Sequence, residues 1–465
     1  MIEKKTKIVC TIGPSSWDPD VMRKMIEAGM NCARVNGAFA DEAELDKVTK
    51  LVRDVSNEVA LMMDIKGPEV RMNKFAEAKT VKPGEEIIIG NNDQSEIYPA
   101  NYQDLYQHLK PGQRIVIGDG DTELRIKEIR GDQMICEVIF GEYLKPGKAM
   151  NLPGADYASS ALTEKDIRNL KHSISIGWDF VSASFMQNAE AAREVKKYLE
   201  GSHMKLIAKI EDEQGVNNID EILEVVDGVM VARGGLGVEL GLEKVPVVQK
   251  TLIKKAVFKG KMVITATQML ESMTSNPRPT RAEVNDVATA IMQGTDAVML
   301  SGESSAGKYP VEAVEFLSKI AIEVEPSLEP EIIEDRTGGP VFTDALTKSA
   351  AQMAIEMGNE LDVILVVTRS GRTAKLIGRH HLKQPIYAFV ADDKFVRGLA
   401  ISKGIIRSYD INHNPQDRDA AVQYVIDKAK ELGVVKTGNR VLFISKVSFT
   451  GEAFFPNVFE LVNVA

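Results

Sequence analysis

Eight short apolar runs of this sequence are each followed by polar side chains that suit a small phosphorylated anion. Lysine and arginine neutralise phosphate, and arginine can do so through two parallel hydrogen bonds. Carboxylates can hold a hard cation through oxygen. The set contains no histidine, so lysine, threonine, glutamate or water would have to carry out acid–base steps. Its members are Thr11, Arg34, Asn36, Asp64, Lys66, Ser184, Lys209, Glu211, Arg233, Thr267, Ser301 and Glu303.

A glycine-rich segment adds a second kind of anion binder. Gly234-Gly235-Leu236-Gly237 opens a helix-like stretch, whose backbone N–H groups can cradle a carboxylate or a phosphate. Taken singly, these features have simpler explanations. A lone lysine or arginine at a strand end is usually solvated or salt-bridged, a glycine cluster is usually a turn, and Thr267 would usually be a cap. Their joint placement at one end of eight strands favours a shared site.

The elements that must position these residues are short apolar strands alternating with amphipathic helices. This rhythm is typical of βα units and a parallel sheet, and eight such units close a barrel. One helix is predicted over residues 247–258 from its single apolar face. The predicted strands lie near residues 6–10, 30–35, 59–64, 179–184, 205–210, 227–232, 261–265 and 296–300.

The third βα unit is interrupted. After Asp64 the helical rhythm stops until about residue 163, and turn residues separate short β-rich runs such as 86–89 and 114–117. The interruption indicates a small β-barrel inserted in a loop at the active-site end, where a lid is expected. Thr163 is a candidate N-cap for the helix that resumes the barrel.

A polar, turn-rich segment after about residue 330 indicates a linker to a further α/β domain. That domain has predicted strands near 362–367, 385–389 and 440–445. We therefore expect a TIM (β/α)₈ barrel with an inserted small β-barrel lid domain and a C-terminal α/β regulatory domain. The expected parts are residues 1–69 (barrel, first part), 70–160 (lid), 161–335 (barrel, second part) and 336–465 (C-terminal domain).

Composition narrows the function classes. The chain has 465 residues and a formal net charge of −10, which argues against a nucleic-acid or membrane-surface binder. The three cysteines, Cys10, Cys32 and Cys136, are far apart and show no CxxC spacing, which fits a reducing cytoplasm. The N-terminus shows no apolar signal core, and no run approaches the roughly 18 apolar residues of a membrane span.

Several motifs together resemble the pyruvate kinase family. They are Thr6-Lys7-Ile8-Val9-Cys10-Thr11-Ile12-Gly13-Pro14, Lys66-Gly67-Pro68-Glu69-Val70-Arg71, Ala208-Lys209-Ile210-Glu211, the run from Val263 through Glu283, and Asp296-Ala297-Val298-Met299-Leu300-Ser301-Gly302-Glu303. The resemblance covers nearly the whole chain and is most specific over residues 200–315. It implies transfer of a phosphoryl group from phosphoenolpyruvate to ADP, giving pyruvate and ATP.

The resemblance also implies roles for individual residues. Lys209 would stabilise the transferring phosphoryl group, and Glu211 would bind Mg²⁺ (or Mn²⁺). The backbone at Gly234 and Gly235, with Thr267, would hold the substrate carboxylate. Ser301 and Glu303 resemble a relay near the enolate. The expected phosphate and nucleotide ligands are Arg34, Asn36, Arg71 and Lys148, and the expected K⁺ ligands are Asn36 and Asp64.

The chain departs from the family pattern inside the site. Gly235 replaces an Asp that binds Mg²⁺, and the family's Phe-Ser-His-Gly after Asn36 is Gly37-Ala38-Phe39-Ala40. Ile65 replaces a Thr, and Gly118 replaces an Asp in the lid. Three hypotheses stay open: a pyruvate kinase with weakened metal binding, a catalytically inactive protein that binds phosphometabolites, and another enolate chemistry on the same barrel. Asp212, next to Glu211, is a candidate replacement ligand.

A second phosphate site is predicted in the C-terminal domain. A loop between a strand and a helix resembles the family's sugar-phosphate effector site, with helix capping as the simpler explanation. Its residues are Thr368, Ser370, Gly371, Arg372 and Thr373, and the tail from Ser445 to Pro456 lacks the family's usual glycine-rich effector loop. The resemblance further implies a homotetramer and a sugar-phosphate or nucleotide effector.

Overall fold

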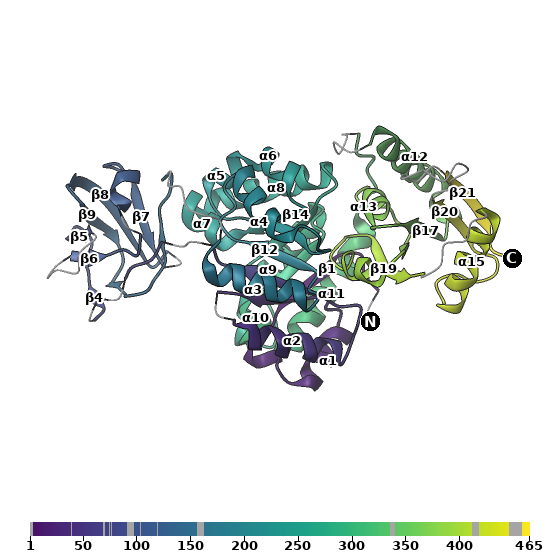
Figure 1. The fold of residues 1–465 in the computed structure, drawn as a ribbon, viewed down its shortest axis with the longest axis horizontal. Coiled ribbons are helices and arrows are strands. Elements are labelled where there is room, and N and C mark those ends of the chain that lie inside the picture. The colour runs from purple at the N-terminus through teal and green to yellow at the C-terminus, as the bar shows by residue number, and fades with distance from the viewer. Residues whose placement is uncertain are drawn as a thin grey trace.

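The structure is a computed structural model that describes residues 3–38, 40–67, 70–73, 75, 77–90, 97–102, 104–118, 120–155, 162–334, 340–411, 418–445 and 458–465. Within these residues the chain forms three parts in a row (Figure 1). An all-β unit lies at one end, a barrel in the middle, and an α/β unit at the other end.

Eight strands close the central barrel in the order β1-β16-β15-β14-β13-β12-β3-β2, and every pairing is parallel. Their sequences are short runs rich in Val, Ile, Met and Ala, which suits strands covered on both faces. All eight predicted strands and the barrel prediction are confirmed. The strands are β1 (Lys7–Thr11), β2 (Cys32–Asn36), β3 (Ala60–Ile65), β12 (Phe180–Ala183), β13 (Lys205–Ile210), β14 (Gly228–Ala232), β15 (Met262–Ala266) and β16 (Ala297–Leu300).

Helices surround the barrel. The helix that resumes the barrel after the insertion begins with a capping box, in which Thr163 Oγ1 accepts from Asp166 N at 3.1 Å and Asp166 accepts from Thr163 N at 3.0 Å. The predicted cap is confirmed. The helices are α1 (Pro19–Glu27), α2 (Glu42–Arg53), α3 (Glu164–Ser175), α4 (Ala189–Leu199), α5 (Glu213–Asn217), α6 (Ile219–Val225), α7 (Arg233–Leu240), α8 (Val245–Phe258), α9 (Arg281–Met292), α10 (Gly302–Ser305) and α11 (Pro310–Val324).

Two apolar cores hold the barrel in shape. One fills the space between the strands and the helices, and the other fills the interior, where Val9, Met62 and Phe180 are fully buried. Ile401, from the C-terminal unit, joins the interior core and is also fully buried. The C-terminal unit therefore packs against the base of the barrel, at the amino ends of its strands.

The insertion is all-β, as predicted. Its described strands form a six-stranded sheet, in the order β11-β7-β8-β9-β5-β6, and a two-stranded sheet of β10 and β4. Buried residues such as Ile89, Ile115 and Leu124 give this unit a core of its own. The strands are β4 (Lys79–Thr80), β5 (Glu86–Gly90), β6 (Ile97–Pro99), β7 (Arg114–Ile117), β8 (Thr122–Arg130), β9 (Gln133–Phe140), β10 (Tyr143–Leu144) and β11 (Met150–Asn151).

The C-terminal unit is a five-stranded sheet in the order β19-β18-β17-β20-β21, with only β21 antiparallel to its neighbour. The three predicted strands are β17, β18 and β20. Sequence reasoning missed β19 and β21 because these edge strands are half-exposed and lack a continuous apolar run. The elements are α12 (Val341–Met357), β17 (Val363–Thr368), α13 (Arg372–Gly378), β18 (Ile386–Val390), α14 (Asp393–Arg397), β19 (Ile405–Asp410), α15 (Arg418–Glu431), β20 (Arg440–Ser445) and β21 (Val458–Asn463).

Two segments singled out in the sequence, the linker and the tail, cannot be compared in full with the structure. Residues 335–339 of the predicted linker and residues 446–457 of the tail lie outside the described residues. In the part of the chain that the structure describes, every helix is too short or too polar to cross a membrane.

Candidate active site at the carboxyl ends of the barrel strands

A buried ion pair forms the centre of the polar cluster. Arg34 and Asp64 come from the neighbouring strands β2 and β3, and Arg34 Nη2 pairs with Asp64 Oδ2. Ser182 Oγ, from β12, donates to Asp64 Oδ1 at 2.5 Å, and Arg34 Nη1 donates to Thr11 Oγ1 at 3.1 Å. Arg34 and Asp64 are only 7% and 4% exposed, so the pair is largely removed from water.

Lys209 extends this cluster from β13. Its Nζ lies 2.7 Å from Ser184 Oγ, 3.2 Å from Asp64 Oδ2 and 3.3 Å from Glu211 Oε1. Burial alone would lower the pKa of the ammonium, but the two carboxylates outweigh it and hold the pKa above its ordinary value. Lys209 is therefore a fixed positive charge at the carboxyl end of the barrel.

Glu211 is the predicted metal ligand, and it lies in the same cluster. Its Oε2 accepts from Phe185 N at 2.9 Å, and burial raises its pKa, against the opposing effect of Lys209. The neighbouring Asp212 faces elsewhere. It caps α5 by accepting from Gly215 N at 2.8 Å, and its other oxygen accepts from Gln187 at 2.8 Å. The α5 cap and Gln187 hold the Asp212 carboxylate apart from the cluster of Lys209 and Glu211, so it does not replace the missing carboxylate beside Glu211.

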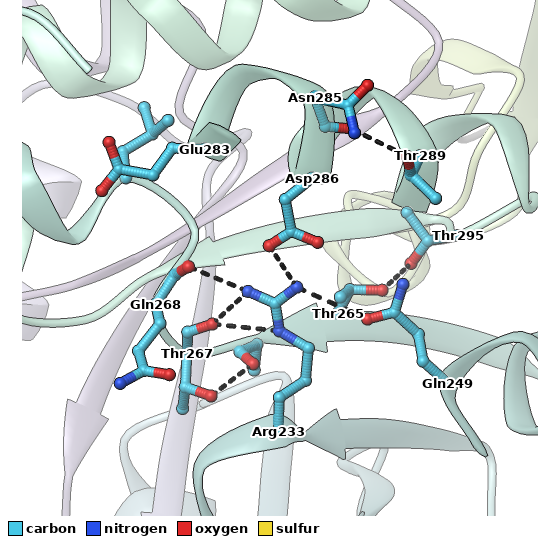
Figure 2. A network of polar contacts seen from close by, with 12 residues as sticks. Arg233, Gln249, Thr265, Thr267, Gln268, Glu283, Asn285, Asp286, Thr289 and Thr295 are labelled. Atoms are coloured by element: carbon cyan, nitrogen blue, oxygen red, sulfur yellow. Dashed lines mark hydrogen bonds and ion pairs between the residues drawn. The ribbon is translucent and has the colours of Figure 1, made fainter. Parts of the chain in front are cut away.

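Thr267 follows β15 in the left-handed backbone region, with φ of +71°. Figure 2 shows how Arg233 holds this turn. Arg233 Nη2 donates to Thr267 O at 2.6 Å and to Gln268 O at 2.9 Å, while Nη1 pairs with Asp286 at 2.5 Å. Gln268 also has a positive φ, of +52°. Two consecutive non-glycine residues in this region cost energy, and the guanidinium offsets that cost by satisfying both carbonyls.

The glycine segment begins α7 directly beside this turn. Gly234 N donates to Thr267 Oγ1 at 2.9 Å, and the same hydroxyl donates to Ala266 O at 2.6 Å. A Cβ on Gly235 would lie 3.0 Å from Glu211 Cβ and 3.1 Å from Glu211 O. Any side chain at position 235 would therefore point its first atom at the predicted metal ligand, and its neighbours would have to yield by a few tenths of an ångström.

Ser301 and Glu303 lie after β16. Glu303 is fully buried, and its two oxygens accept from Leu270 N at 3.0 Å and from Ser301 N at 2.7 Å. These bonds join the loops after β15 and β16. The geometry favours a positioning role for Glu303, because both of its oxygens are already satisfied by the backbone.

The loop after β2 approaches β3 very closely. Gly37 N donates to Asp64 O at 2.9 Å, and a Cβ on Gly37 would lie 2.2 Å from that same oxygen. Only glycine fits this conformation. Asn36 Oδ1 accepts from Ala38 N at 3.2 Å, Ile65 is buried, and Phe39 lies outside the described residues.

The two expected phosphate ligands of the insertion lie within that unit. Arg71 Nη1 donates to Gly147 O at 2.6 Å, and Lys148 Nζ lies 3.3 Å from Asp121 Oδ2. Pro68 and Glu69, which belong to a motif quoted above, lie outside the described residues.

The predicted effector loop joins β17 to α13. Thr368 ends the strand, Gly371 has φ of +84°, and Arg372 and Thr373 begin the helix. Thr373 is 4% exposed, and a Cβ on Gly371 would lie 2.4 Å from the Leu399 side chain. Gly371 is the N-cap of α13, and the start of this helix has no side-chain cap hydrogen bond in the described residues, so hydroxyl capping is not seen here.

Sequence reasoning missed three residues of the site. Ser182 lies two positions before Ser184, and the alternation of strand side chains places both on the barrel interior. That signal was available. The backbone amide of Phe185 and the partnership of Asp286 with Arg233 depend on loops that meet only in the folded chain. In the described residues, no group of three His, Cys, Asp or Glu side chains forms a preformed metal site.

Comparisons with known proteins agree with this architecture. Residues 3–314 match the family model "Pyruvate kinase, barrel domain", and residues 344–458 match "Pyruvate kinase, alpha/beta domain". Pyruvate kinase of Clostridium perfringens is 39% identical over 459 residues, covering 94% of this chain and 95% of that protein. The Geobacillus stearothermophilus pyruvate kinase is also 39% identical, covering 99% of this chain and 80% of that protein.

A solved structure supports the same assignment. The crystal structure of a pyruvate kinase from Cryptosporidium parvum superposes with a TM-score of 0.89 at 30% identity, covering 99% of this chain and 96% of that one. The resemblance inferred from the motifs is confirmed by the family models, the relatives and the fold. The chain belongs to the pyruvate kinase family of phosphotransferases.

Proposed function

We propose that the chain transfers the phosphoryl group of phosphoenolpyruvate to ADP and releases pyruvate and ATP. The observation that carries this proposal is the buried cluster of Arg34, Asp64, Lys209 and Glu211 at the carboxyl ends of three barrel strands. Two cations held by two carboxylates offer a charged, pre-oriented surface to an anionic substrate. Such a surface suits phosphoryl transfer, which depends on positioning and charge stabilisation more than on covalent chemistry.

Lys209 and Arg34 are proposed to meet the phosphoryl oxygens. Both are charged and held in place before substrate binds, so little reorganisation is needed when charge develops in the transition state. The backbone of Gly234 and Gly235, with Thr267, is proposed to hold the substrate carboxylate. The position of this carboxylate-binding segment relative to Lys209 depends on Arg233, because Arg233 holds the Thr267 turn.

Glu211 is proposed to hold Mg²⁺ (or Mn²⁺). When bound, the ion would neutralise charge on the carboxylate and phosphoryl oxygens of the substrate. Magnesium is commonly held by one or two protein carboxylates, with waters and substrate oxygens as further ligands. Glu211 supplies one such carboxylate and Gly235 supplies none, so the donor set fits Mg²⁺ with a single acidic ligand.

A K⁺ site at Asn36 and Asp64 stays a prediction. Both oxygens of Asp64 already have partners, since Ser182 donates to one and Arg34 and Lys209 contact the other. A monovalent ion would share Asp64 with these groups. Comparing turnover in K⁺ with turnover in tetramethylammonium at equal ionic strength tests the prediction.

A coupled assay tests the proposed reaction. Pyruvate formation from phosphoenolpyruvate and ADP is measured while Mg²⁺ and Mn²⁺ are raised separately. We expect turnover that saturates only at high metal concentration. A folded protein that produces no pyruvate at saturating metal would overturn the proposal, and a product other than pyruvate would favour another enolate chemistry.

A second candidate is a non-catalytic protein that binds phosphometabolites. Gly235 favours it, because the chain keeps the anion-binding cations while lacking one carboxylate beside Glu211. This candidate requires phosphoenolpyruvate binding without turnover. Titration calorimetry beside the coupled assay separates the two, since turnover that depends on Lys209 excludes it.

Further properties are proposed from family membership. We propose domain boundaries at residues 69/70, 160/161 and 335/336, a homotetramer, a cytoplasmic location, and a sugar-phosphate or nucleotide effector at the loop from Thr368 to Thr373. The domain of residues 336–465 would then be regulatory. Sedimentation and effector titration of the purified chain test the assembly and the effector.

A further inference from the structure

A small cavity lies between the base of the barrel and the C-terminal unit, at the opposite end of the barrel from the candidate active site. The barrel contributes Lys261 and Asp296, from the segments that precede β15 and β16. The C-terminal unit contributes Lys375 from α13, Ser402 and Lys403. In Figure 1, α13 lies on the side of the C-terminal unit that faces the barrel.

Positive charge is in excess in this cavity. Four cationic side chains line it, against the single carboxylate of Asp296; they are Lys261, Lys375, Arg379 and Lys403. Asp296 is already occupied, since Oδ1 accepts from Lys403 N at 2.7 Å and Oδ2 from Val263 N at 2.9 Å. The other carboxylate that acts on Lys375, Asp227, is paired with Lys196 at 2.5 Å.

Three of the cations donate a hydrogen bond to a carbonyl oxygen. Lys261 Nζ donates to Val226 O at 2.7 Å, Lys403 Nζ donates to Ile291 O at 3.0 Å, and Arg379 Nη1 donates to Phe258 O at 2.8 Å. A carbonyl satisfies a donor without cancelling its charge. These hydrogen bonds therefore leave the charges of Lys261 and Lys403 uncancelled.

Two groups in the cavity have hydrogen-bonding capacity to spare. The side-chain ammonium of Lys375 makes no hydrogen bond or ion pair with any described residue, although its backbone N–H and C=O are bonded within α13. Ser402 is 2% exposed, and its Oγ has no hydrogen-bond partner in the described part of the chain. Leaving a buried hydroxyl unsatisfied typically costs about 1–3 kcal/mol. An ammonium and a hydroxyl in one cavity form a donor set for an oxyanion.

We propose that this cavity binds one inorganic phosphate ion, with Lys375 and Ser402 as direct ligands. A tetrahedral oxyanion supplies both a negative charge and several acceptor oxygens, which are the two things that the cavity lacks. The bound ion would connect α13 to the barrel. Because α13 begins at Arg372, the ion would also stabilise the helix that starts at the proposed effector loop.

The titration behaviour of the lysines supports this site. Burial lowers the pKa of Lys261 and of Lys403 to about 8, and it lowers the pKa of Lys375 below its ordinary value. A negative charge within a few ångströms favours the charged form of an amine. A bound phosphate would therefore raise these pKa values and remove part of the cost of burying the lysines.

Titration calorimetry of the full chain with inorganic phosphate, without divalent metal, tests the proposal. The active-site cluster can bind phosphate as well, so four proteins are compared: wild type, Lys375→Met, Lys209→Met and the double variant. We expect Lys375→Met to remove one phosphate per chain and to leave the one that depends on Lys209. The double variant should lose both.

A milder variant and a matched control keep the test decisive if Lys375→Met folds poorly. Ser402→Ala preserves size and should weaken the same phosphate about tenfold. Lys254→Met, at an exposed lysine on α8, should change nothing. Equal stoichiometry and affinity in wild type, Lys375→Met and Ser402→Ala would overturn the proposal. Displacement of the ion by glycerol 3-phosphate would overturn the assignment to the free ion, because the cavity is small.

Discussion

Lys205 and Lys209 lie four residues apart on the same strand, β13, at opposite ends of the barrel, and their environments have opposite effects. Both are removed from water. Burial lowers the pKa of Lys205 to about 7, whereas the pKa of Lys209 stays above its ordinary value because Asp64 and Glu211 outweigh burial. Lys205 Nζ donates to a carbonyl, that of Gly398, and has no carboxylate partner within hydrogen-bond distance among the described residues.

The difference shows that a buried lysine becomes a reliable positive charge only where carboxylates are placed beside it. Two oxygens at 3.2 and 3.3 Å are enough at Lys209. At the base of the barrel Lys205, Lys261 and Lys403 donate to carbonyls, which orient a donor without stabilising its charge. The catalytic end therefore presents a charge that carboxylates stabilise, whereas the ammonium groups of these three lysines have only carbonyl oxygens as hydrogen-bond partners among the described residues. Four variants can break or sharpen this contrast.

Removing the charge at the catalytic end should have the largest effect. Lys209→Ala leaves Asp64 and Glu211 without their shared cation and removes the charge proposed to meet the phosphoryl group. We expect kcat to fall by about 10³-fold or more. The coupled pyruvate assay measures this, with Lys197→Ala on the exposed face of α4 as the control. Activity within tenfold of wild type would show that the charge of Lys209 is not used.

Arg233 is a further cation of the catalytic end with a carboxylate partner, Asp286, and it acts through Thr267. Arg233→Met should release the left-handed turn and leave two carbonyls and Asp286 unsatisfied, lowering kcat/KM by about 10- to 100-fold. Arg233→Lys should recover part of the loss, and Arg193→Met, on an exposed helix face, should have no effect. Equal losses in the Lys and Met variants would contradict a specific role for the guanidinium.

Adding a carboxylate at the catalytic end tests the contrast in the opposite direction to removing a cation. Gly235→Asp places a second acid beside Glu211, and we expect about tenfold tighter apparent Mg²⁺ binding. The close contact of the new Cβ with Glu211 should lower stability by about 1 kcal/mol. Gly235→Asn supplies the same shape without the charge. If the Asn variant binds Mg²⁺ as tightly as the Asp variant, the missing carboxylate does not limit metal binding.

The effect expected at the base is on stability alone and depends on pH. The pKa of Lys205 is about 7 in the folded chain and has an ordinary value of 10.5, so between these values the unfolded chain binds more protons. Stability of the wild type should therefore rise with pH from about 7 to 9, by up to about 1.4 kcal/mol per pH unit from this residue. Lys205→Met should lack this part of the slope.

Urea unfolding followed by tryptophan fluorescence measures how the free energy of unfolding changes with pH in wild type and in Lys205→Met. Trp17 and Trp178 report on the barrel because both pack with its core. Lys259→Met, at a partly exposed lysine on the barrel surface, is the control. Identical slopes for wild type and Lys205→Met would mean that Lys205 keeps its proton, and the contrast with Lys209 would fail.

Much of the fold was predictable from local pattern. Each barrel strand is a buried apolar run with a polar residue at its carboxyl end, and the closed topology brings these ends together. The edge strands β19 and β21 were missed because half-exposed strands lack that pattern. Most expected residues of the barrel site are brought together, and Arg34, Asp64, Lys209 and Glu211 form one cluster.

The sequence by itself determined the barrel, the family and the identity of the charged residues, because these depend on periodicity and on motifs of adjacent residues. Only the tertiary structure decided which atoms remain available for chemistry. Asp212 is occupied by a helix cap, the guanidinium of Arg233 by a strained turn, and Glu303 by two backbone amides. Their partners come from loops far apart in the chain, and pairing between distant segments cannot be read from local spacing.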